Sequence, residues 1–287
     1  MIAALALLVA AFAPAEGGTV VLLRSSGAAP YLATAAAFRA AWRGPLVELA
    51  ADDETGGTPA RRLAELAPEV VVAVGLRAAL LTREALPRTP LVHCLVSDPG
   101  RWQLAGPWVT GVAADVPPRA VLEALRAAAP SARRVGLLYG SATGGELAHA
   151  ARVAAAALGV SMVEAPVADL AGLPAAARGL ADRADALWLP ADPTVASPEA
   201  FQFLLELSLA RRKPLVVFSE SLVRAGALLA VVPDYGWTGM AAAEAVRRVL
   251  SGERAGDVPL AAPTRTRVVS NADVARAIGA TPAGVAP

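Results

Sequence analysis

Short apolar runs alternate with helical patterns along the chain, and this alternation predicts the fold. In the first part we expect buried strands at residues 19–23, 45–50, 70–74 and 90–96, with helices at 31–42, at 58–66 and after Gly75. Continuous apolar strands that are each followed by a helix are typical of parallel sheets covered on both faces.

The second part of the chain repeats this order. Strands are expected at 134–139, 160–164, 186–189 and 214–218, and helices at 146–158, at 173–180 and from Ser197-Pro-Glu199 onward. Val135 lies 115 residues after Val20, and Ala186 lies 116 residues after Val70. The sequence therefore predicts an α/β protein with two doubly wound parallel-sheet lobes joined by a hinge.

The remaining segments indicate how the chain passes between the lobes. A strand at 228–232, a helix at 237–250 and a strand near 267–269 would cross back, and residues 108–112 would form the first crossing. We accordingly assign 18–110 with about 233–262 to lobe 1, and 111–232 with about 263–287 to lobe 2.

Composition excludes several classes of protein. With 287 residues, 55% of them hydrophobic, and a net charge of +1 from dispersed basic residues, the chain does not resemble a nucleic-acid-binding protein. A single cysteine and two histidines provide neither a disulfide nor a metal motif. His93 and Cys94 are neighbours on an expected strand, so their side chains should point to opposite faces.

The first residues are typical of an export signal. Residues 1–12 are almost wholly apolar and lead into Ala13-Pro-Ala15, with Ala11-Phe-Ala13 as the alternative cleavage site, although no Lys or Arg precedes them. The apolar run is too short to span a membrane, and no cysteine follows it to carry a lipid anchor. We expect residues 1–15 to be a signal peptide and the mature protein to be periplasmic, without direct membrane insertion.

Acidic side chains follow several of the expected strands. In open parallel sheets, ligands bind beyond the carboxyl ends of the strands. Asp98 and Asp192 are candidates to hold a ligand ammonium group, or they are turn residues before Pro99 and Pro193. Glu220 and Asp234 are further candidates, and Glu220 could equally cap the helix that follows it.

Hydroxyl groups also cluster in these loops. Ser25 and Ser26 precede one expected helix, and Ser141 and Thr143 precede another, where hydroxyls and free N–H groups suit an anion or simply cap the helix. Tyr31 could contact a ligand or pack in the core. The predicted ligand-binding set is Ser25, Ser26, Tyr31, Gly75, Leu76, Asp98, Ser141, Thr143, Asp192, Thr194, Glu220 and Asp234.

A series of short motifs resembles one known family. They are Val71-Val-Ala-Val-Gly75, Val109-Thr-Gly-Val112, Asp115-Val-Pro-Pro118, Arg134-Val-Gly-Leu-Leu-Tyr139, Asp185-Ala-Leu-Trp-Leu-Pro190, Asp192-Pro-Thr-Val195, Phe218-Ser-Glu220, Arg224-Ala-Gly-Ala-Leu228 and Pro233-Asp-Tyr235. In order and spacing the chain resembles the ABC transporter substrate-binding proteins that include tryptophan- and tyrosine-binding members. The resemblance covers essentially the whole mature chain and implies the type I periplasmic-binding-protein fold.

The resemblance implies that the chain captures a small polar solute, possibly an amino acid, between its lobes and delivers it to a membrane permease. A monomer without a cofactor is expected. The alternative is a ligand-sensing receptor that signals to a partner protein. Two loops depart from the family pattern: Gly140 replaces a common Asn, and Leu76-Arg77 replaces a smaller residue.

Catalysis is not expected, because the chain contains no phosphate loop, no dinucleotide fingerprint and no nucleophile elbow.

Overall fold

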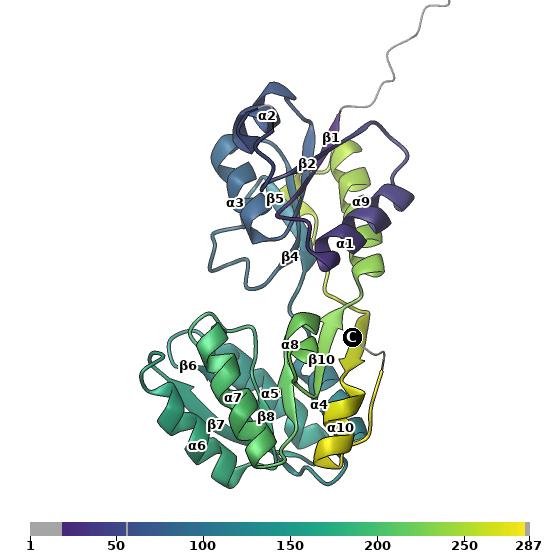
Figure 1. Cartoon of the computed structure of the whole chain (residues 1–287). Coiled ribbons are helices and arrows are strands. Elements are labelled where there is room, and N and C mark those ends of the chain that lie inside the picture. The colour runs from purple at the N-terminus through teal and green to yellow at the C-terminus, as the bar shows by residue number, and fades with distance from the viewer. Residues whose placement is uncertain (1–18, 56, 285–287) are drawn as a thin grey trace, which may run out of the picture.

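The computed structural model describes residues 19–55 and 57–284 as two lobes, each built on its own sheet (Figure 1). The expected signal peptide at 1–15 lies outside the described residues. Within these ranges, none of the helices combines the length and the apolar character that a membrane crossing requires.

Lobe 1 contains a five-stranded parallel sheet in the order β2-β1-β3-β4-β5. Its strands are β1 (Val20–Arg24), β2 (Leu46–Ala50), β3 (Val70–Val74), β4 (Leu91–Val96) and β5 (Val109–Ala113). Helix α1 (Ala29–Ala41) and the distant α9 (Tyr235–Leu250) cover one face of the sheet, while α2 (Pro59–Glu65) and α3 (Leu76–Ala85) cover the other (Figure 1). The 3-10 turn η1 (Ala255–Asp257) lies against β5.

Lobe 2 contains a six-stranded sheet in the order β11-β10-β9-β8-β6-β7. Its strands are β6 (Arg134–Gly140), β7 (Ser161–Val167), β8 (Ala186–Trp188), β9 (Leu215–Val217), β10 (Leu229–Pro233) and the antiparallel β11 (Thr266–Ser270). One face packs on α4 (Pro118–Ala128), α5 (Gly145–Ala157) and α10 (Ala272–Ile278), and the other on α6 (Leu173–Arg183), α7 (Pro198–Ala210) and α8 (Glu220–Arg224).

The two sheets have the same topology, which confirms the predicted fold class. The order β2-β1-β3-β4-β5 in lobe 1 is matched by β7-β6-β8-β9-β10 in lobe 2, with β11 added at the edge. The periodicity of the sequence located most strands to within a residue or two. Uninterrupted apolar strands such as the fully buried β3 are the easiest to locate in the sequence, because helices cover both faces of the sheet.

The prediction for residues 108–112 was wrong. Instead of crossing between lobes, Val109–Ala113 forms β5, the edge strand of lobe 1, and pairs with β4. The crossing itself follows at 114–117, a second crossing is at Asp234, and a third runs through 262–265. A Val-rich segment satisfies its backbone better in a sheet than in an extended linker.

All three crossings lie at the carboxyl ends of strands. The first follows β5, the second follows β10, and the third enters β11 opposite the end of β10, where Asp234 N donates to Arg265 O at 3.0 Å. Because parallel strands end at a common edge, the carboxyl edges of the two sheets face each other across the junction (Figure 1).

The hydrophobic core is divided between the lobes. Four clusters of buried side chains cover the two faces of each sheet, two clusters to a lobe. In lobe 1, α1 and α9 approach so closely that a β-carbon on Gly239 would lie 2.4 Å from Thr34 O and 2.6 Å from Phe38 N. The absence of a side chain at Gly239 is therefore required for α1 and α9 to pack against each other.

We predict that Gly239→Ala lowers the free energy of unfolding by about 1–3 kcal/mol, because the added methyl group overpacks two helix backbones. Gly179→Ala on α6 is the control, since a β-carbon there meets nothing within 4 Å. It should raise stability by up to about 1 kcal/mol through helix propensity. Urea unfolding of the two variants checks this, and equal effects would contradict the close approach of the helices.

His93 is a buried titratable group inside lobe 1. Its side chain lies on β4 with 1% of its surface exposed, and burial lowers its pKa from 6.5 to about 4. Cys94 packs in the cluster on the opposite face of the sheet, beneath α1 and α9, as expected for adjacent strand residues. His93 is therefore a neutral imidazole at pH 7.

This neutral imidazole should make stability depend on pH. Below pH 6.5 the unfolded chain binds a proton at His93 that the folded protein does not accept until about pH 4. The free energy of unfolding should fall by about 2–3 kcal/mol across this range on account of His93. Urea unfolding of the wild type and of His93→Phe between pH 6.5 and 4 checks this. Only the wild type should show this contribution to the fall in the free energy of unfolding.

The control is His149→Phe, which changes an exposed residue of α5. It should lose stability with falling pH in parallel with the wild type. If the free energy of unfolding of the wild type and of His93→Phe changed with pH in the same way, His93 would not be held neutral by burial.

Candidate ligand-binding site

In lobe 1, three predicted residues converge at the ends of β1 and β3. A β-carbon on Gly75 would lie 2.5 Å from Ser25 Oγ and 2.9 Å from Tyr31 Cζ. Gly75 has a φ of 94°, which favours glycine, so the chain can turn here from β3 directly into α3. The structure thus brings Ser25, Tyr31 and Gly75 together, with Leu76 as the first, half-buried residue of α3.

The two serines of this loop have different roles. Ser25 is buried, and its Oγ accepts a hydrogen bond from Ala78 N at 3.0 Å, so it caps α3 from a neighbouring strand. Ser26 is half-buried, and its Oγ accepts a local hydrogen bond from Ala28 N at 3.3 Å. The capping alternative therefore describes Ser25, although the helix it caps is not the one that follows it in sequence.

In lobe 2, the corresponding cluster lies at the ends of β6 and β8. Asp192 is 5% exposed; its Oδ2 accepts from Thr143 Oγ1 at 2.7 Å and its Oδ1 from Thr194 N at 2.8 Å. A β-carbon on Gly140 would lie 2.4 Å from Thr194 Oγ1 and 2.5 Å from Thr143 Oγ1. Glycine at position 140, where the family commonly has Asn, therefore leaves room for Thr143 and Thr194 to lie over the end of β6.

The two clusters occupy equivalent places in the duplicated fold. In each lobe the first and third strands in sequence are neighbours, and their ends supply the polar groups. Asp192 carries a buried negative charge with lone pairs still available, and hydroxyl groups surround it. Ser141, also predicted, is exposed beside this cluster.

Asp98 lies next to an acidic residue that sequence reasoning did not select. Asp98 is exposed, has a φ of 45°, and donates from its backbone N to Asp115 Oδ2 at 3.1 Å. Loss of hydration among the surrounding protein atoms raises the pKa of the Asp115 carboxyl, and the charge of Asp98 adds to this, although the hydrogen bond from Asp98 opposes it. The sequence feature that could have indicated Asp115 is its position two residues after the end of β5.

Glu220 and Asp234 already have partners within the protein. The Glu220 carboxylate forms an ion pair with Arg267 of β11, and Arg224 lies 3.9 Å away. Arg267 also lies 5.5 Å from the Tyr235 ring, and burial together with the Glu220 charge raises the pKa of the Tyr235 hydroxyl. Asp234 caps α9 by accepting from Trp237 N at 2.9 Å. Sequence reasoning missed Arg267 and Tyr235, because their pairing joins segments far apart in the chain.

Comparison with known proteins identifies the class and the family. The solved, ligand-free, open structure of a substrate-binding protein with adhesive properties from Clostridium difficile superimposes with a TM-score of 0.73 at 20% identity, over 94% of this chain and 98% of that one. The structure of an ABC domain in complex with L-Trp from Streptococcus pneumonia gives 0.63 at 19% identity, over 92% and 96%. The fold is that of the two-lobed type I periplasmic binding proteins.

A family model described as ABC transporter substrate binding protein matches residues 49–282. The chain belongs to this family, which is one of binding proteins rather than enzymes. A curated relative, the tyrosine-binding protein of Clostridioides difficile strain R20291, is 22% identical over 218 residues, or 73% of this chain. The match spans 63% of that relative's length.

We predict that substitutions at Ser25 and Ser26 differ in their effect on stability. Ser25→Ala should lower the free energy of unfolding by about 1–3 kcal/mol, because it leaves the Ala78 amide buried without a partner. Ser26→Ala is the matched control and should change it by less than about 0.5 kcal/mol. Thermal and urea unfolding check the pair, and a small effect for Ser25→Ala would contradict its capping role.

Proposed function

We propose that this protein is the solute-binding component of an ABC importer, and that it captures an amino acid between its lobes. The observation that carries the proposal is the buried, hydroxyl-lined carboxylate of Asp192 at the carboxyl edge of lobe 2, which is turned toward the equivalent edge of lobe 1. An amino acid carries the ammonium group that such a carboxylate would bind.

Binding proceeds by hinge closure in this proposal. The two lobes turn about the crossings at 114–117, 234 and 262–265. Separate hydrophobic clusters in each lobe support this, because rotation of one lobe leaves the packing of the other intact. A ligand that contacts both edges stabilises the closed state by its differential affinity for that state.

The ligand's two charged ends meet different parts of the site. Asp192 of lobe 2, with Thr143 and Thr194, receives the ammonium group. The Ser26 hydroxyl and the start of α3 at Leu76 face the carboxylate from lobe 1, where free N–H groups favour an anion. Asp98, together with Asp115 of the first crossing, offers a second position for a cation.

The side chain of the ligand is proposed to be aromatic. This rests on the names of similar proteins, one a tyrosine-binding protein and one solved in complex with L-Trp. Tyr31, half-buried next to Gly75, offers a ring for stacking. Export to the periplasm and delivery of the solute to permease subunits at the membrane complete the proposal.

We predict that Asp192→Asn weakens binding of the preferred amino acid by about 2–4 kcal/mol, because the ammonium group then lacks its counter-charge. A thermal-shift screen of the twenty amino acids first identifies the ligand, and calorimetry then measures the affinity.

The matched control is Asp182→Asn, which removes an exposed carboxylate of α6 that pairs with Arg211. It should leave the affinity unchanged. If both variants fold normally and Asp192→Asn binds the amino acid as tightly as the wild type, the role of Asp192 is rejected. If no amino acid stabilises the protein in the screen, the ligand class is rejected.

A further inference from the structure

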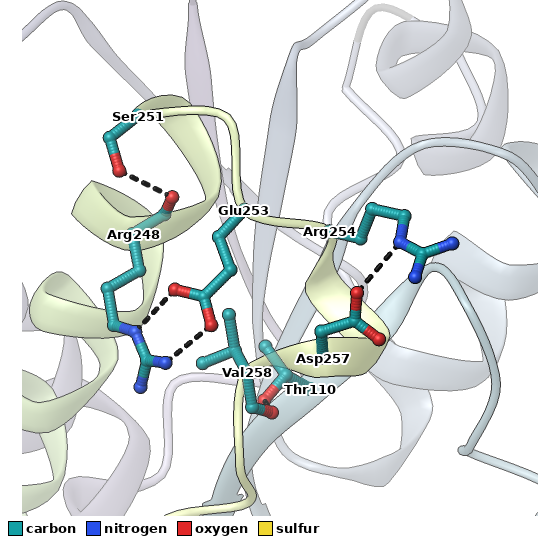
Figure 2. Close-up of polar contacts among 7 residues, drawn as sticks. All are labelled: Thr110, Arg248, Ser251, Glu253, Arg254, Asp257 and Val258. Atoms are coloured by element: carbon teal, nitrogen blue, oxygen red, sulfur yellow. Dashed lines mark hydrogen bonds and ion pairs between the residues drawn. The ribbon is translucent and has the colours of Figure 1, made fainter.

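Helix α9 is fixed to lobe 1 along its whole length. Its buried side chains pack in the cluster beneath α1, and the helix lies against β3, β4 and β5. At its end Ser251 Oγ donates to Arg248 O at 2.8 Å, and Arg248 Nε donates to Glu253 Oε2 at 2.7 Å (Figure 2). The segment that follows is bonded to β5, where Thr110 Oγ1 donates to Val258 O at 2.8 Å (Figure 2). Any rotation of lobe 1 therefore carries α9 with it.

The first side chain of α9 nevertheless packs in the other lobe. Tyr235 is half-buried and contacts the apolar cluster of lobe 2 that lies beneath α6, α7 and α8. Trp237, two residues further along the same helix, packs against the cluster of lobe 1. The start of the helix is itself fixed, because Asp234 Oδ1 accepts from Trp237 N and Thr238 Oγ1 donates to Asp234 O, both at 2.9 Å. The Tyr235 ring thus joins a helix of lobe 1 to the core of lobe 2.

Charged side chains of lobe 2 surround this ring. The Arg267 guanidinium lies over the ring, 5.5 Å from its centroid, where a cation is attracted to the aromatic face. Glu220 pairs with Arg267 and holds it in place, and Arg224 lies 3.9 Å from the same carboxylate. Burial, the Glu220 charge and a hydrogen bond that the hydroxyl donates to Glu220 raise the pKa of Tyr235. All three charged residues belong to lobe 2, whereas the ring moves with lobe 1.

Rotation about the crossings has to move the ring against these partners. Tyr235 directly follows the crossing at Asp234, and its ring reaches from there to Arg267 and Glu220. A hydrogen bond weakens steeply when its donor and acceptor are misaligned, and a cation over an aromatic ring must stay close to the ring face. These contacts therefore favour the orientation of the lobes described here over other orientations.

We propose that Tyr235 is a positioning residue that fixes the angle between the two lobes. The inference concerns the lobes themselves and needs no ligand. It also adds to the function proposed above, and in that respect rests on it, because it names the contact that hinge closure has to rearrange.

The test measures the distance between one spin label on each lobe of the full protein. Ala40→Cys on α1 and Val153→Cys on α5 place the labels at exposed positions. The native Cys94 is fully buried, and burial raises its pKa to about 12, so it stays unlabelled. Double electron–electron resonance without ligand then gives the distribution of distances between the lobes.

Tyr235→Ala should broaden this distribution about twofold, because the lobes lose their preferred angle. Tyr235→Phe, which keeps the ring over Arg267 and lacks the hydroxyl, should broaden it less. Arg267→Gln removes the cation from the side of lobe 2 and should also broaden it, which tests the same contact even if Tyr235→Ala does not fold. The matched control is Trp237→Ala, which removes a large ring of the same helix from lobe 1. It should lower the free energy of unfolding and leave the distribution as in the wild type.

An unchanged distribution in Arg267→Gln and in folded Tyr235→Ala, or equal broadening by Trp237→Ala, would overturn the proposal. The result is separable from the fate of the amino-acid proposal. L-tryptophan added to the labelled wild type tests closure by that ligand, and an unshifted distribution would count against that ligand and not against the role of Tyr235.

Discussion

The parallel pairing of strands is the constraint on which the rest of this protein depends. In a parallel sheet every strand ends at the same edge, and here the chain leaves each lobe only at that edge. The three crossings therefore turn the carboxyl edges of both sheets toward each other. The helices that follow each strand also begin there, so their free N–H groups and the polar loop residues collect at one junction.

Polar contacts at the junction divide into those that fix the crossings and those that we propose to bind the ligand. The ion pair of Glu220 with Arg267 joins α8 to β11, and the cap at Asp234 fixes the start of α9. Each stabilises a point where the chain passes between lobes. Asp192 differs, because its partners Thr143 and Thr194 are uncharged and it lies after a strand end, not at a crossing.

Local pattern in the sequence predicted the alternation of elements, the duplication and the positions of the polar loops. It succeeded because buried parallel strands such as β3 are unbroken apolar runs, and because signals such as Ser197-Pro198 mark a helix start. It failed at Val109–Ala113, since an edge strand and an extended linker have similar composition. It also missed the partners of Glu220 and Asp98, because Arg267 and Asp115 are brought there by tertiary folding.

Lobe 1 is completed by a segment that follows most of lobe 2 in the chain. Its core beneath α1 contains Ala242 and Val246 of α9 together with Val258, and the edge of β5 is bonded by Ala261 N to Gly111 O. During synthesis the strands of lobe 1 therefore keep an open apolar face until α9 and the segment to Ala261 have been made. Lobe 2 needs only β11 and α10 to finish. The last segments that the two lobes need, which end near Ala261 and Ile278, therefore leave the ribosome in close succession, and neither lobe can complete its core long before the other.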